Sequence, residues 1–140
     1  MIERNKAVVR ALVDAVNQHD LDRVAGLVAE GFVRHSAAAG QPGVRSRDDL
    51  LCFLRAEREA FPDAAETIED ILAEGDRVAV RHRFTGTQLG PLGGRPPLGR
   101  RMTAGYLAIY RLADGQVVEA WAEWDNLDGL VQLGHLPPDP

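Results

Sequence analysis

Acidic and aromatic residues alternate near the C-terminal end, and they are the residues of this sequence best suited to chemistry. Every second position of one extended segment carries Val117, Glu119, Trp121, Glu123 and Asp125. On an ideal strand these side chains share one face. Three carboxylates on a dry face would repel one another and would be costly to desolvate. Either that face is in water or a bulge redirects part of it, and the sequence leaves both open.

Asp125 differs from the other acids because it ends the expected strand just before an expected helix. A carboxyl group in an apolar pocket has a raised pKa, so it could take a proton from carbon and return one to oxygen. By residue type alone, a role as N-cap of the following helix is the better interpretation of Asp125. Glu119 and Glu123 are expected to be solvated charges near the strand end.

Three helices are expected before the strands. The apolar spacing over residues 9–16 predicts the first, and Asp20 can cap a second that ends at Gly31. A short extended piece follows at residues 32–35, and then a loop over residues 36–45. Ser46 caps the third helix, which Pro62 ends because proline lacks the backbone amide.

A period of two replaces the helical spacing from Ala65 onward and predicts four strands, at residues 65–74, 77–87, 102–112 and 116–125. Asp114-Gly115 indicates a hairpin between the last two strands. The Gly/Pro-rich connection over residues 90–99 is typical of a lid or binding loop. Asn126 can cap a short final helix, which Gly134 ends. Helices followed by antiparallel strands predict an α+β fold with a pocket on the concave side of a curved sheet.

The composition argues against two classes of binding partner, nucleic acids and membranes. The net charge of -5 lacks the basic excess that nucleic-acid binding requires, and no apolar run is long enough for a membrane span. The single cysteine, Cys52, is expected to be a core or semi-buried residue without a disulfide. The arginines between residues 77 and 101 are expected on a solvated outer face. We therefore expect one cytoplasmic domain over residues 1–140.

Several short motifs occur in a characteristic order. The C-terminal ones are Val117-Val118-Glu119, Trp121, Asp125, Leu127 and Gln132-Leu133-Gly134. Before them come His35, Phe61-Pro62-Asp63, Gly86-Thr87 with Gly90, and Pro96-Pro97 with Gly99. In this order and spacing, the sequence resembles the SnoaL-like polyketide cyclases over nearly its whole length.

The resemblance implies the cone fold of nuclear transport factor 2: about three N-terminal helices on a strongly curved, mainly antiparallel sheet, with a short C-terminal helix. It also implies intramolecular aldol ring closure of a small hydrophobic substrate, without cofactor or metal. Asp125 would be the acid and base, and His35 would orient or polarise a carbonyl. The side chains implied to line the substrate pocket are Trp121, Tyr106, Tyr110, Phe84, Trp124 and Phe61.

Three positions depart from the family pattern. Ala120, Gln88 and Leu98 stand where relatives often carry histidine, histidine and threonine. A hydrolase, isomerase or hydroxylase activity in the same pocket therefore stays open, as does a non-catalytic module for small-molecule binding or dimerisation. His82 is expected to be structural. A homodimer is expected from the large side chains on an exposed sheet face.

Overall fold

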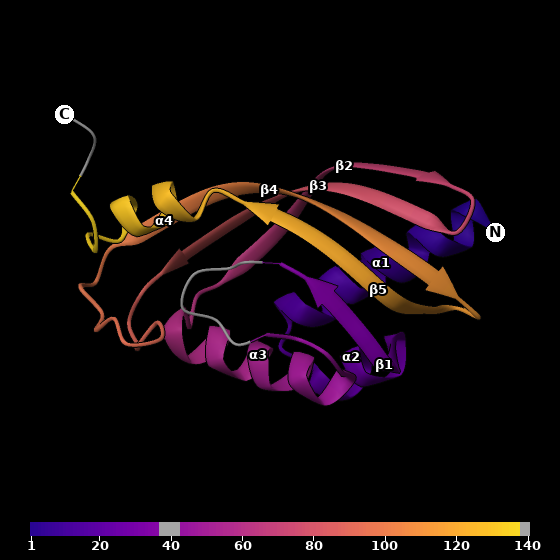
Figure 1. The fold of residues 1–140 in the computed structure, drawn as a ribbon, viewed down its shortest axis with the longest axis horizontal. Helices are drawn as coiled ribbons and strands as arrows, with labels where there is room; N and C mark the ends of the chain where they lie inside the picture. The colour runs from indigo at the N-terminus through magenta and orange to yellow at the C-terminus, as the bar shows by residue number, and fades with distance from the viewer. Residues whose placement is uncertain (37–42, 138–140) are drawn as a thin grey trace.

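The computed structural model describes residues 1–36 and 43–137, and Figure 1 shows how their helices and strands are arranged. In chain order the elements are α1 (Ile2–Asn17), α2 (Leu21–Leu27), β1 (Val28–His35), α3 (Arg47–Ala60), β2 (Ala65–Glu74), β3 (Arg77–Thr87), β4 (Arg101–Ala113), β5 (Gln116–Trp124) and α4 (Asn126–Gln132). The fold is α+β, as expected. No described helix is long and apolar enough to cross a membrane.

One mixed sheet, in the order β1-β5-β4-β3-β2, forms the wall of the cone. All of its neighbouring strands are antiparallel except β1 and β5, which are parallel. The sheet curves over α1 and α3, and α4 lies beyond the end of β5 (Figure 1). Between β4 and β5, Asp114 and Gly115 have φ values of 51° and 78°, the paired left-handed residues of a tight hairpin turn.

Two apolar clusters fill the space between the helices and the concave face. The larger contains Val9 and Leu12 of α1, Phe53 and Leu54 of α3, and the strand residue Val80. The smaller lies at the α4 end and contains Phe61, Phe84, Leu92, Met102 and Leu133, among others. Burial of these side chains is the main favourable term for the fold.

The N-terminal half differs from the sequence prediction in two places. The second helix ends at Leu27, and Val28, which lies within the range predicted for that helix, begins β1 and pairs with Val117. Gly31 therefore lies within a strand instead of ending a helix. A β-branched valine that is fully buried between strands gains more from the sheet than from one more helical turn. Within the predicted loop of residues 36–45, residues 37–42 lie outside the described residues.

Two smaller expectations are also corrected. Cys52 is exposed on α3, because it falls outside the stripe of that helix that faces the sheet. The cap of α4 is Asp125 and not Asn126, since the Asp125 side chain accepts a hydrogen bond from the backbone N–H of Asp128. The expectation of solvated arginines is confirmed for Arg81 and Arg83, which pair with acids of β2 at 2.7 Å.

A bulge at Val118 settles how the acids of β5 are oriented. Val117 pairs with Leu112 of β4, but the next residue of β4, Arg111, pairs with Glu119. Val117 therefore joins the buried face, while Glu119 lies on the outer face of the sheet. Both alternatives left open by the sequence apply: the strand is bulged, and the face with the acids is in contact with water.

Residues of the motifs quoted above connect separate elements through side-chain hydrogen bonds. The carboxylate of Asp63, after α3, accepts hydrogen bonds from the backbone N–H and the hydroxyl of Thr87, at 2.7 and 2.8 Å. The side chain of Gln132 bonds to both backbone polar groups of Thr103 on β4, at 2.8 and 2.9 Å. These hydrogen bonds connect the end of α3 to β3, and α4 to β4.

Gly90 is a close-approach position. A Cβ atom at Gly90 would overlap the backbone carbonyl of Glu59, which α3 holds in place. We expect Gly90→Ala to lower the free energy of unfolding by about 1–3 kcal/mol through this overlap. The measurement is chemical denaturation, with Gly94→Ala as control because the same Cβ would meet open space there. Equal stability of the two variants would contradict this packing.

Candidate active site

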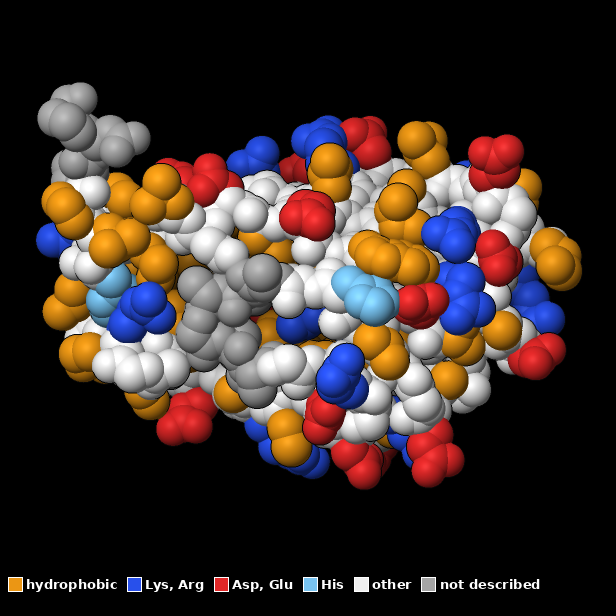
Figure 2. Space-filling model, viewed as in Figure 1, with side chains coloured by type: hydrophobic (Ala, Val, Ile, Leu, Met, Phe, Trp, Pro, Cys, Tyr) orange, Lys and Arg blue, Asp and Glu red, His pale blue; other side chains and the backbone are white. Residues whose placement is uncertain are grey.

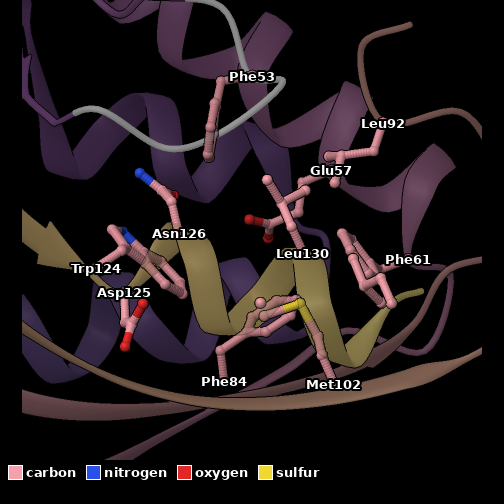
Figure 3. A pocket seen from close by; sticks show the side chains of 12 residues that line it. Phe53, Glu57, Phe61, Phe84, Leu92, Met102, Trp124, Asp125, Asn126 and Leu130 are labelled. Carbon is pink, nitrogen blue, oxygen red and sulfur yellow. The ribbon is translucent and has the colours of Figure 1, made fainter. Parts of the chain in front are cut away.

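Two adjoining hollows lie between the concave face and α3, and they share Phe53, Glu57 and Trp124 as walls. They contain about 520 and 710 Å³ of empty space, part of which is open to solvent. Figure 3 shows the first, with apolar side chains from α3, α4, β3, β4 and β5 around the Glu57 carboxylate and with Asp125 at the edge. We call the two together the interior cavity. Its largely apolar walls with few polar groups are typical of small-molecule sites.

Glu57 provides that carboxylate. It lies in the last turns of α3, and its side chain points into the group of residues that lines the cavity (Figure 3). Burial raises its pKa to about 7, with a smaller contribution from the negative charge of Glu66. Arg34 and Arg58 act in the opposite direction. The carboxyl group makes no hydrogen bond to a described residue, so it is available to a ligand.

Arg34 of β1 reaches into the second hollow from the opposite wall. Its guanidinium carbon lies 3.9 Å from the centre of the Phe53 ring, a cation–π contact. Its Nε atom is buried with no hydrogen-bond partner among the described residues. Desolvation lowers the pKa of this guanidinium from its ordinary value, although arginine remains charged.

Two hydrogen-bonded pairs of residues form the sheet side of the same hollow. The Tyr106 hydroxyl donates to the carboxylate of Glu66, at 2.7 and 2.8 Å from its two oxygens. His82 Nε2 lies 2.8 Å from the Tyr110 hydroxyl, and His82 Nδ1 lies 3.4 Å from Glu66 without hydrogen-bond geometry. Burial, followed by the charge of Glu66, raises the pKa of both tyrosines, so both are neutral near pH 7.

Aromatic rings continue from this group toward α4. Tyr106 is stacked on His82 at 4.3 Å and on Trp124 at 3.9 Å. Phe84 then meets Trp124 and Phe61 edge to face. The structure thus places five of the six side chains proposed for substrate contact, Tyr106, Tyr110, Phe84, Trp124 and Phe61, on the walls of the interior cavity.

Asp125 lies at the rim of the cavity and not inside it. Its carboxylate Oδ1 accepts from the backbone N–H of Asp128 at 2.9 Å, and the residue is exposed. In Figure 3 it stands at the edge of the group, beside Trp124. The expected acid in an apolar enclosure is therefore found at Glu57, while Asp125 occupies the capping role that its residue type also favoured.

Trp121 and His35 lie together on the outer face of the sheet, away from the interior cavity. The rings stack at 5.4 Å, His35 Nε2 lies 2.7 Å from Glu119, and Arg77 covers Trp121. The expectation of a pocket role for Trp121 is wrong, because the bulge at Val118 fixes which residues of β5 face outward. The structure likewise separates His35 from Asp125 and from Glu57.

Comparison with known proteins identifies the family to which this fold belongs. The family model for SnoaL-like polyketide cyclase matches residues 6–133. The chain belongs to the SnoaL-like polyketide cyclase family. Among its relatives, aklanonic acid methyl ester cyclase DauD of Streptomyces sp. (strain C5) is 28% identical over 136 residues, 95% of this chain and 83% of DauD.

Two solved structures extend the comparison. The proposed hydroxylase AclR of Streptomyces galilaeus is 32% identical, with a TM-score of 0.83 over 100% of this chain and 87% of AclR. The proposed polyketide cyclase IdmH of Streptomyces antibioticus is also 32% identical, with a TM-score of 0.80 over 93% of this chain and 98% of IdmH. The fold is that of the family, including the short C-terminal helix.

The three departures of this SnoaL-like chain have different structural settings. Ala120 faces the second hollow beside Arg34, to which it is paired across β1 and β5. Gln88 is fully buried and holds the following loop through bonds to the carbonyls of Gly90 and Arg95 and to His135. Leu98 is exposed. Of the three departures, Ala120 is the one on the wall of the interior cavity.

Glu57, Arg34, Glu66 and His82 were missed as site residues by the sequence analysis, yet the first three had a signal. Glu57 continues the apolar stripe of Leu50, Phe53 and Leu54 at the next helical position, where a charge is out of pattern. Arg34 follows Phe32 at strand spacing, and Glu66 precedes Ile68 in the same way. A charged residue in a buried stripe is uncommon unless it is paired or functional.

The raised pKa of Glu57 makes the stability of the protein depend on pH. Between about pH 4.5 and 7 the folded state keeps a proton that the unfolded state has lost, so stability falls as the pH rises through this window. Glu57→Gln removes this penalty. We expect the variant to gain about 2–3 kcal/mol relative to wild type between pH 5 and pH 8, measured by denaturant unfolding.

Glu59→Gln is the matched control, since it makes the same change at an exposed position of the same helix. Its curve should run parallel to wild type at every pH. A constant difference between Glu57→Gln and wild type from pH 5 to pH 8 would contradict an apolar setting for the Glu57 carboxyl.

Proposed function

We propose that this chain closes a ring by intramolecular aldol condensation on a small, hydrophobic, polyketide-derived substrate, with Glu57 as its proton acceptor and donor. One observation carries the proposal: a carboxyl group with a pKa of about 7 points into a largely apolar cavity and bonds to no described residue. A base is most effective when its pKa lies near the working pH. The chemistry uses groups of the chain alone.

The steps follow from one carboxylate. Ionised Glu57 removes a proton from the carbon next to a substrate carbonyl, and the electron pair of that C–H bond becomes an enolate. The enolate carbon attacks a second carbonyl of the same molecule and closes the ring. The new alkoxide then takes the proton back from Glu57, which restores the starting carboxylate. Substrate and product are isomers.

The walls of the cavity support the choice of substrate. The stacked rings of Tyr106 and Trp124 offer flat apolar surface, as a planar polyketide requires. DauD carries a methyl ester cyclase activity in its name, which favours ring closure as the chemistry. The similarity to AclR favours hydroxylation as the second candidate. The mass of the product separates the two, because cyclisation leaves it unchanged and hydroxylation adds one oxygen.

We also propose a homodimer that forms through the outer face of the sheet and works in the cytoplasm. Leu107 and Ile109 of β4 are 61% and 41% exposed there, beside the stacked pair of Trp121 and His35. Acidic and basic side chains are interspersed over the face shown in Figure 2, with no large region of one sign. The cytoplasmic location is supported by the single, exposed cysteine, because a chain with one cysteine forms no internal disulfide and needs no oxidising compartment. A monomer at all concentrations in sedimentation would refute the dimer.

A pair of variants tests the acid. We expect Glu57→Gln to lower the turnover of aklanonic acid methyl ester, or of a related open-ring polyketide, by about 100- to 10,000-fold. Asp125→Asn keeps the helix cap and should stay within about threefold of wild type. Wild-type kcat/KM should rise with pH toward a plateau above about pH 7, as Glu57 ionises.

The reverse pattern would refute the assignment. Loss of turnover in Asp125→Asn, with Glu57→Gln active, would return the acid-base role to Asp125, as the family resemblance implies. A product one oxygen heavier than the substrate would replace cyclisation by hydroxylation.

A further inference from the structure

The interior cavity holds a positive charge, that of Arg34, for which the described residues provide neither a hydrogen-bond acceptor nor an ion-pair partner. Arg34 makes no hydrogen bond to a described residue through its guanidinium, and its Nε is buried. No described carboxylate lies within ion-pair distance of it. Among the described residues, its specific contact is the face of the Phe53 ring, 3.9 Å away, and a ring face is a weaker partner than an oxygen anion.

The polar groups on the sheet side of the second hollow are already committed to one another. Glu66 receives the Tyr106 hydroxyl, and the Tyr110 hydroxyl is bonded to His82, so these oxygens are not aimed at the guanidinium. A buried charge without a hydrogen-bonded partner is costly. Ala120, the neighbour of Arg34 across the strands, is small and leaves the space beside the guanidinium unfilled. An oxygen of a bound molecule would supply the hydrogen-bond acceptor that the described residues do not offer to Arg34.

We propose that Arg34 binds the substrate carbonyl oxygen that becomes the enolate oxygen when Glu57 removes the proton. The inference rests on the proposed function for the identity of the base. Both residues line the second hollow, with Glu57 on α3 and Arg34 on β1. A substrate between them would present its C–H bond to the carboxylate and its oxygen to the guanidinium.

The movement of negative charge toward Arg34 during proton removal makes this pairing favourable. Before the step, the cavity holds the Glu57 carboxylate and the Arg34 cation. After it, the proton is on Glu57, and the electron pair of the C–H bond has moved to the oxygen beside Arg34. The net charge of the cavity is unchanged, while the negative charge moves toward a fixed donor. Stabilisation of charge where it develops is the form of electrostatic catalysis with the largest effects.

The pairing also defines the substrate class. The molecule must carry an acidic C–H bond next to a carbonyl, as in a 1,3-dicarbonyl compound, within a flat apolar framework. A stable enolate of that shape should then bind to the resting protein. Because one negative charge balances Arg34, enolate binding should favour protonated Glu57. The other charged or titratable groups facing Glu57 are Arg58 of α3, Glu66 of β2, His82 of β3, and Tyr106 and Tyr110 of β4.

The test uses 4-hydroxycoumarin, a flat bicyclic 1,3-dicarbonyl compound whose enol is ionised in neutral water, and coumarin, which lacks the hydroxyl group. Binding to the full chain is measured by calorimetry at pH 6 and pH 8. We expect wild type to prefer 4-hydroxycoumarin, and Arg34→Met to bind it about 10- to 100-fold more weakly with little change for coumarin. Arg77→Met is the matched control, because Arg77 also covers an aromatic ring but on the outer face.

Glu57→Gln separates this inference from the proposed function. Wild type should bind the enolate up to about tenfold more weakly at pH 8 than at pH 6, and Glu57→Gln should lose most of this dependence. If Arg34→Met does not fold, as judged by near-UV circular dichroism, Arg34→Lys replaces it, with an expected loss of about tenfold.

Three results would overturn the role of Arg34: no binding of 4-hydroxycoumarin to wild type, no preference for it over coumarin, or equal losses in Arg34→Met and Arg77→Met. None of these touches the assignment of the base, which the turnover of Glu57→Gln decides. Selective loss of enolate binding in Arg34→Met supports the inference even if Glu57→Gln keeps its turnover.

Discussion

The proposed chemistry of the cavity depends on one physical constraint, the removal of the Glu57 carboxyl group from water. Glu57 extends from α3 into space walled by Phe53, Phe61 and Trp124, where water no longer sets its affinity for a proton. The pKa near 7 follows from this burial, and the charge of Glu66 adds to it. A group in this setting destabilises the folded state when it ionises, so the surrounding structure must be stable enough to hold it. The two apolar clusters on either side of the cavity supply that stability.

The family motifs of this chain connect the elements that enclose the cavity. Asp63 is joined to Thr87 and Gln132 to Thr103, while Gln88, one of the departures from the family pattern, orders the loop that follows β3. These bonds tie α3, α4 and the strand ends together around the wide end of the cone (Figure 1). The groups suited to proton transfer and to charge stabilisation lie on inward-facing positions of α3 and the sheet.

Local sequence signals predicted most of the fold. The period of two predicted the bounds of β2 and β3 as the structure has them, and Asp114-Gly115 predicted the hairpin between β4 and β5, because these features depend on near neighbours. The start of β1 and the bulge at Val118 depend on pairing between distant segments, so the sequence left them wrong or open. The site was less predictable for the same reason. Asp125 was chosen for its place at a strand end, but the inward direction of Glu57 follows from how α3 packs on a sheet formed later in the chain.

The most direct measurement of the central claim is the pKa of the Glu57 carboxyl group, from the ¹³C chemical shift of its side-chain carboxyl carbon as a function of pH. The resonance is assigned by its absence from the Glu57→Gln variant. The account predicts a midpoint near pH 7, well above the ordinary value of about 4.5. A midpoint near 4.5 would show that the carboxyl group is in contact with water and would contradict the account.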